Sequence, residues 1–142
     1  MKKKLIFISF VTLFACNKNE KPVIYTTQDA YLKKYEQIPS TYLSKISLNG
    51  YIDLDTIETN VIKQNIPILN TGRKIIKDLY LKTTCDCTTV NDYKKTLLPN
   101  EGDTLKIAID VSKENGYFSK KVILYGTFYP YKRIIEVIGF KK

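Results

Sequence analysis

The sequence contains no histidine and no tryptophan, and only two of its 23 basic side chains are arginine, Arg73 and Arg133. The absence of histidine excludes Ser-His and Cys-His nucleophile pairs, histidine metal sites and histidine pH switches. Proteins that bind nucleic acid rely on arginine for bidentate contacts to bases and phosphates, so the scarcity of arginine argues against that class. The sequence also lacks Ser-x-x-Lys, Gly-x-Ser-x-Gly, phosphate-loop and dinucleotide patterns. We therefore expect a non-enzymatic protein that needs no cofactor and binds no nucleic acid.

The chain has 142 residues, which fits one domain, and a domain of this size needs neither metal nor disulfide to bury a core. The formal net charge is +9, and without Lys2, Lys3 and Lys4 it falls to +6, from 20 basic and 14 acidic side chains. A modest excess of positive charge, carried mainly by lysine, is typical of a solvated surface. It would also favour binding to an anionic membrane or an acidic glycan.

An apolar run of eleven residues, Leu5 to Ala15, follows the three N-terminal lysines. A helix of that length spans about 16 Å, well short of the roughly 30 Å hydrocarbon core of a bilayer. The run is therefore interpreted as the core of a secretory signal peptide covering residues 1–15.

The run ends in Leu13-Phe14-Ala15-Cys16, which resembles the lipobox of bacterial lipoproteins. The resemblance implies that Cys16 is acylated and, after cleavage, becomes the new N-terminus. Two or three acyl chains hold a protein stably in a membrane. Asn17 stands where inner-membrane lipoproteins carry aspartate, which by the same resemblance favours the outer membrane. The alternative is an ordinary signal peptide with a cysteine near its cleavage site.

Residues 16–42 are expected to form the lipidated cysteine, a polar tether and one short helix. Asp29 to Ile38 places Tyr31, Lys34, Tyr35 and Ile38 at helical spacing, and Pro39 ends the pattern.

From residue 43 the hydrophobic period changes to two, which predicts strands. Asn49-Gly50 suggests a type I′ hairpin between the first two of them. The predicted strands lie at 43–48, 51–57, 61–69, 75–81, 93–98, 105–111, 118–125 and 133–140, with an aromatic-rich loop at 126–131. About seven short strands with regular turns predict an all-β, immunoglobulin-like sandwich over residues 43–142.

The segment from about residue 65 to 140 resembles the domain of unknown function 1573, found in bacterial lipoproteins and other exported proteins. The resemblance rests on features in the family's order: Asn70-Thr71-Gly72, Thr84-Cys85-Asp86-Cys87-Thr88, the turn Leu98 to Gly102, Asn115 to Val122, and a last strand with Gly139. It implies an exported Ig-like domain. The family has no established activity.

Cys85 and Cys87 allow three interpretations. Residues two apart on a strand lie about 6.6 Å apart, near the upper limit for a disulfide, so a bridge would need a local bend. The pair could be structural, bridged or reduced. It could instead form a labile redox disulfide, or bind a soft metal such as Cu(I) as two thiolates.

Two other groups stand out. Asp53, Asp55 and Glu58 could suggest a Ca²⁺ site or an acid pair, but too few oxygen ligands surround them, and a solvated strand face opposite Ile52 and Leu54 is favoured. The second group could be a binding patch or could cap the core; it consists of Tyr125, Phe128, Tyr129 and Tyr131.

The sequence thus predicts an outer-membrane lipoprotein of the cell envelope, anchored through Cys16, whose Ig-like domain binds an envelope protein or glycan. Alternatives are a thiol redox or copper-handling lipoprotein that uses Cys85 and Cys87, and a purely structural subunit of an envelope assembly.

Overall fold

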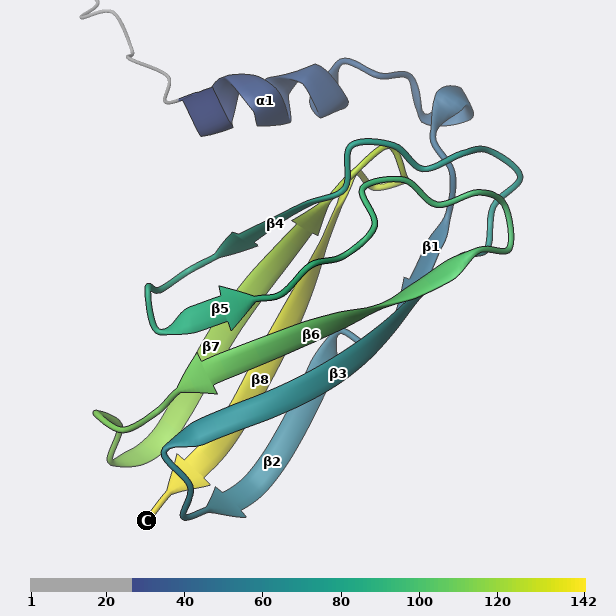
Figure 1. Ribbon diagram of the computed structural model, residues 1–142. Helices are drawn as coiled ribbons and strands as arrows, with labels where there is room; N and C mark the ends of the chain where they lie inside the picture. Colours follow the sequence, from purple (N-terminus) through teal and green to yellow (C-terminus); the bar gives the residue numbers. More distant parts are fainter. Residues whose placement is uncertain (1–26) are drawn as a thin grey trace, which may run out of the picture.

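The computed structural model describes residues 27–142, with side chains from Leu32 onwards, and it is an all-β sandwich. One sheet has the strand order β1-β3-β6-β5 and the other β2-β8-β7-β4. The expected signal peptide, Cys16 and most of the tether lie outside the described residues. Figure 1 shows α1 at one end of the sandwich and the C-terminus at the other. No helix among residues 27–142 is long and apolar enough to cross a membrane.

The strands are β1 (Ile46–Leu48), β2 (Tyr51–Ile57), β3 (Val61–Asn70), β4 (Tyr80–Thr83), β5 (Thr88–Val90), β6 (Gly102–Asp110), β7 (Gly116–Tyr125) and β8 (Lys132–Lys141). The helix α1 (Thr27–Glu36), predicted at 29–38, is followed by the 3₁₀ turn η1 (Ser40–Tyr42). Most strands therefore lie where the two-residue period places them, and the predicted sandwich is confirmed.

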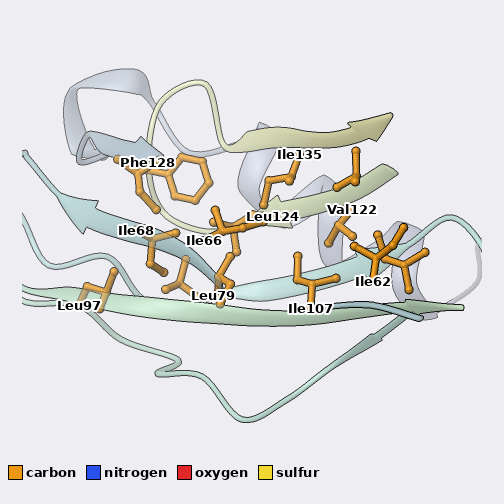
Figure 2. Close-up of a cluster of buried hydrophobic side chains, with 14 of the residues drawn as sticks. Ile62, Ile66, Ile68, Leu79, Leu97, Ile107, Val122, Leu124, Phe128 and Ile135 are labelled. Atoms are coloured by element: carbon orange, nitrogen blue, oxygen red, sulfur yellow. The ribbon is translucent and has the colours of Figure 1, made fainter. Parts of the chain in front are cut away.

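The core lies between the two sheets and consists mainly of the alternate residues along the strands that point inward (Figure 2). Leu105, Ile107, Ile109 and Val111 are all buried, as the alternation along β6 predicts. Phe118, Val122 and Leu124 of β7 face them from the other sheet. Burying one such side chain contributes roughly 1.5–3 kcal/mol, so this double layer is the main source of stability.

The predicted hairpin at Asn49-Gly50 is wrong. β1 pairs antiparallel with β3, whereas β2 pairs parallel with β8 in the opposite sheet. Neither Asn49 nor Gly50 has the positive φ that a type I′ turn requires. Gly50 instead allows a close approach, because a Cβ there would lie 2.7 Å from the carbonyl oxygen of Ile134. The chain crosses from one sheet to the other at this point.

The strand predicted at 75–81 begins only at Tyr80, and the two-residue period that would place Ile75, Leu79 and Leu81 on one face is not kept. Ile76 and Leu79 are buried, whereas Ile75 is 42% exposed. The reason is Asp78, whose φ of 54° breaks the two-residue alternation. Ile76 and Leu79 can then point to the same side although they are three residues apart.

Residues 93–98 form no strand, contrary to the prediction, and their only β-bridge within the described residues is the isolated one between Leu97 and Ile76. Side chains bind the backbone donors that a strand would use. Asp103 Oδ2 accepts from the N–H of Lys94 at 2.7 Å, and Glu101 Oε2 accepts from the N–H of Leu98 at 2.7 Å. The hydrogen bond from Lys94 Nζ, at 2.6 Å, lowers the pKa of Glu101 below its usual 4.5.

Asn70, fully buried at the end of β3, joins three segments. Its Oδ1 accepts from Ser44 Oγ at 2.8 Å and from the N–H of Gly72 at 3.1 Å. Its Nδ2 donates to the carbonyls of Lys74 and Leu97 at 2.8 and 2.9 Å. A Cβ on Gly72 would lie 2.2 Å from Ser44 Oγ, so glycine is required there. The predicted Asn-x-Gly turn is thus a buried hydrogen-bond junction.

The helix α1 covers one end of the sandwich through Tyr35, which is 1% exposed. The Tyr35 hydroxyl donates to the carbonyl of Asp78 at 2.6 Å. Tyr131 donates its hydroxyl to Glu36 at 3.0 Å, a bond that raises the pKa of Tyr131. Burial of Tyr35 and these two bonds hold the helix against the segment that precedes β4 and the loop that follows β7.

Candidate functional site

Cys85 and Cys87 lie in the turn between β4 and β5 and form a disulfide. Their Cα atoms are 5.2 Å apart, so the turn supplies the local bend that an extended strand lacks. Both cysteines are half-buried and Asp86 between them is exposed. Thr88 Oγ1 lies 3.4 Å from Cys85 Sγ and 3.8 Å from Cys87 Sγ. The bridge is therefore close to solvent but supported on one side by a buried threonine.

No group of three or more His, Cys, Asp or Glu side chains in residues 32–142 is arranged to hold a metal ion. A soft metal binds cysteine as the thiolate, and the two sulfurs of a disulfide are not thiolates. Metal binding at this turn would thus require reduction first.

The aromatic patch expected at residues 125–131 is divided by the structure. Tyr125 and Phe128 are buried, with 6% and 0% of their surface exposed, and belong to the packed interior. For these two side chains the binding-surface interpretation is wrong and the alternative, that they cap the core, fits their burial. The loop folds inward against Leu79 and is hydrogen-bonded to Ser44. Only Tyr129, 63% exposed, and the half-buried Tyr131 remain at the surface.

Another surface was not singled out from the sequence. An open groove of about 780 Å³, called the distal groove here, lies where the end of β8 runs between β2 and the start of β7. Figure 1 places these strand ends at the end of the sandwich opposite α1. The groove is lined by Asp53, Asp55, Thr56, Tyr117, Phe118, Ser119, Ile138, Gly139 and Phe140.

Two aromatic rings dominate the apolar side of the distal groove. Tyr117 is 89% exposed, and its ring makes an edge-to-face contact with Phe140, with centroids 4.9 Å apart and planes at 76°. The two residues are register partners on β7 and β8. The contact fixes the orientation of the tyrosine ring while most of its surface stays open to solvent.

Gly139 brings β8 close to the ring of Phe118, its register partner on β7. A Cβ at Gly139 would lie 2.8 Å from Phe118 Cζ and 3.4 Å from the carbonyl oxygen of Asp55. Because glycine has no side chain, β2, β7 and β8 can approach one another closely at this end. The family glycine noted in the sequence therefore has a packing role.

The acidic side of the distal groove is a β-bulge. The register between β2 and β8 shifts between Asp53 and Thr56, and Asp55 has a φ of 55°. Asp53 Oδ1 accepts from the N–H of Asp55 at 2.9 Å. Both aspartates are exposed, as the favoured interpretation expected, but the bulge replaces the regular strand face. A bulge also blunts the outer edge of β2 against pairing with another strand.

The sequence contained one usable signal for the distal groove. Tyr117, Phe140 and Ile138 occupy the outward positions of β7 and β8, where a solvated face usually carries polar residues. That these positions meet the aspartates of β2 depends on the parallel pairing of β2 with β8, which local patterns do not reveal.

Two four-stranded sheets, with the chain crossing from one to the other between β1 and β2, form an Ig-like β-sandwich. The chain belongs to the family described as protein of unknown function DUF1573, whose model matches residues 48–140. This confirms the resemblance seen in the sequence and extends it towards the N-terminus, through the first four residues of β3 and all of β2.

Solved structures support the same fold at low sequence identity. A protein of unknown function from Porphyromonas gingivalis W83 is 16% identical with a TM-score of 0.63, over 74% of this chain and 50% of that one. The PapD-like domain 7 of human CEP192 is 11% identical with a TM-score of 0.57, over 75% and 91%. The secreted serine protease VesC from Vibrio cholerae is 12% identical with a TM-score of 0.57, over 82% and 26%.

The chain thus spans half the length of the Porphyromonas protein and about a quarter of VesC. A comparison with curated proteins finds no significant match. At these identities the similar structures show the fold alone.

Proposed function

We propose that the chain is an outer-membrane lipoprotein, cleaved after residue 15 and acylated with palmitate or similar chains on Cys16. In this proposal the sandwich acts without catalysis as an envelope binding or assembly module. The observation that carries the binding role is the distal groove, an open surface with an 89% exposed tyrosine at the end of the sandwich opposite α1.

The position of that groove suits an anchored domain. The chain enters the described structure at α1, so an anchor at Cys16 would connect to that end. The eleven steps from Cys16 to Thr27 span at most about 40 Å when extended. A domain held this way presents the distal groove away from the membrane surface and towards partners.

The partner in this proposal is an envelope protein or glycan. The groove combines apolar rings with carboxylate and hydroxyl groups, which is the composition expected of a surface that recognises a specific ligand. Exposed aromatic side chains supply contact area at low conformational cost.

A photo-crosslinking amino acid at position 117 in intact cells tests the binding role. The same amino acid at Asn65, exposed on the outer face of β3 in the other sheet, is the control. We expect one discrete, reproducible crosslinked species from position 117 and none from position 65. Equal or diffuse crosslinking from both positions would remove the support for a binding module acting through this groove.

The half-buried disulfide favours one alternative, a thiol redox role. A partner thiolate would attack one sulfur and release the other as a thiolate, and a second partner thiol would then resolve the mixed disulfide, leaving both cysteines reduced and the partner oxidised. A count of free thiols under denaturing conditions, with and without reductant, tests this role in freshly secreted protein. Two free thiols without reductant would eliminate the bridge. Copper retained after dialysis, and lost in Cys85→Ser, would support metal handling instead.

A further inference from the structure

We propose that the distal groove binds an arginine side chain presented by a protein partner. This inference rests on the proposed binding role and narrows its partner to a protein segment that carries a guanidinium group. It follows from two properties of the groove, its local charge and its exposed ring.

The charge of the distal groove is opposite to that of the chain. The chain carries 23 basic and 14 acidic side chains, yet the groove is lined by two carboxylates and no basic residue. Neighbouring acidic residues are paired, Glu58 with Lys142 at 3.5 Å and Glu114 with Lys120 at 2.5 Å. No lysine or arginine in residues 32–142 forms an ion pair with Asp53 or Asp55. The groove therefore offers two carboxylates to a cation from another molecule.

The ring of Tyr117 adds a preference among cations. The face of an aromatic ring is negative, and it attracts a cation placed over it. A guanidinium is flat and weakly hydrated, so it can stack on a ring while its N–H groups donate to carboxylates. A lysine ammonium is compact and strongly hydrated and cannot stack in this way. Rings and carboxylates in one open groove thus match arginine best.

No lysine or arginine lines the groove, so no such side chain would have to move before a ligand enters. The lining also includes the smaller residues Thr56, Ser119 and Gly139. The hydroxyls of Thr56 and Ser119 stand beside the carboxylates as further hydrogen-bonding groups, although Ser119 also donates to Glu136 at 2.7 Å. A neutral sugar could stack on the same ring and donate its hydroxyls to the carboxylates, but it would leave their negative charge uncompensated.

The test uses the full ¹⁵N-labelled chain in detergent micelles and the peptide acetyl-Gly-Arg-Gly-Arg-Gly-amide, followed by amide chemical shifts. The matched control peptide carries citrulline at both arginine positions, which keeps the shape and removes the charge. We expect saturable shifts at Ser119, Ile138 and Phe140 with the arginine peptide only. Because surface charge pairs are screened, binding should weaken as salt rises above about 0.15 M.

Variants identify the groups responsible. Asn at position 53 keeps the oxygen that accepts from the N–H of residue 55, and Asn tolerates the positive φ at position 55, so Asp53→Asn/Asp55→Asn should fold. This double variant should raise the Kd about tenfold, and Tyr117→Ala about fivefold. Asp86→Asn/Asp92→Asn makes the same change of charge at exposed positions elsewhere, and Tyr42→Ala removes a 69% exposed ring at the end of η1; both should leave the Kd unchanged.

Three results would overturn the inference: no saturable shift, equal shifts with the citrulline peptide, or equal weakening by the control variants. Equal binding of the citrulline peptide would mean that the groove accepts neutral ligands such as glycans or peptide backbone. If the arginine peptide fails while position 117 still yields a discrete crosslinked species in cells, the binding role stands and only the ligand assignment fails. If both fail, the binding role fails as well.

Discussion

Replacing Asn70 by alanine removes the junction that joins the end of β3 to three other segments. The amide makes four side-chain hydrogen bonds, to Ser44, Gly72, Lys74 and Leu97, and the residue is fully buried. Alanine leaves two buried or part-buried carbonyls, one hydroxyl and one N–H without these partners. The chain continues on both sides of the gap, so the segments cannot simply move together.

The magnitude follows from the number of bonds. A hydrogen bond contributes about 1 kcal/mol net, and an unsatisfied buried group costs about 1–3 kcal/mol. Four bonds therefore predict a loss of about 3–5 kcal/mol in the free energy of unfolding, well above the ordinary effect of a point substitution. Ser44→Ala breaks only one of them and should cost about 1 kcal/mol.

Urea unfolding followed by circular dichroism measures these losses. The midpoint of Asn70→Ala should fall by about 2 M. Asn65→Ala, an exposed asparagine on the outer face of the same strand, is the matched control and should stay within about 0.5 kcal/mol of the wild type. A loss below about 1 kcal/mol for Asn70→Ala, or a loss equal to that of Asn65→Ala, would refute the reasoning.

Three further predictions concern the loops and strands around the core. The lowered pKa of Glu101 stabilises the fold above its unfolded value near 4.5, and this contribution is lost as pH falls through the lower folded value. Stability should thus fall less steeply between about pH 5 and 3 in Glu101→Gln than in the wild type, and parallel pH profiles would contradict this. Gly139→Val should cost about 1–3 kcal/mol, because its Cβ meets the Phe118 ring and a backbone carbonyl; an unchanged melting temperature would show that the strands move apart freely. Phe128→Ala should cost about 3–5 kcal/mol and Tyr129→Ala less than about 0.5 kcal/mol, and similar losses for both would mean that the loop is packed differently.

Elements with unbroken alternation could be predicted from the sequence. Leu105 to Val111 and Phe118 to Leu124 each place every second residue inward, so both the strands and their buried faces followed from the two-residue period. The strand predicted from Ile75 to Leu81 was wrong because a single residue, Asp78, takes a left-handed conformation. The neighbouring residues in the sequence do not indicate this conformation. The strand expected at 93–98 failed because Glu101 and Asp103 bind its backbone donors, and such side-chain bonds depend on a turn several residues away.

The candidate sites depended still more on tertiary structure. Proximity along the chain grouped Tyr125, Phe128, Tyr129 and Tyr131, but burial divides them between core and surface. Tyr117 and Phe140 are 23 positions apart and meet only because β7 and β8 are in register. Asp53 joins them only through the parallel pairing of β2 with β8, which no local pattern indicates.

In our proposal an anchor at Cys16 sets which end of the sandwich reaches outward, and the mass of the mature N-terminal peptide tests that anchor most directly. Protein isolated from the membrane fraction should yield a peptide that begins at Cys16 and carries the added mass of two or three acyl chains. The same peptide from Cys16→Ser should lack that mass and the protein should leave the membrane fraction. A wild-type peptide that begins at Met1, or an unacylated Cys16, would contradict the anchored binding module.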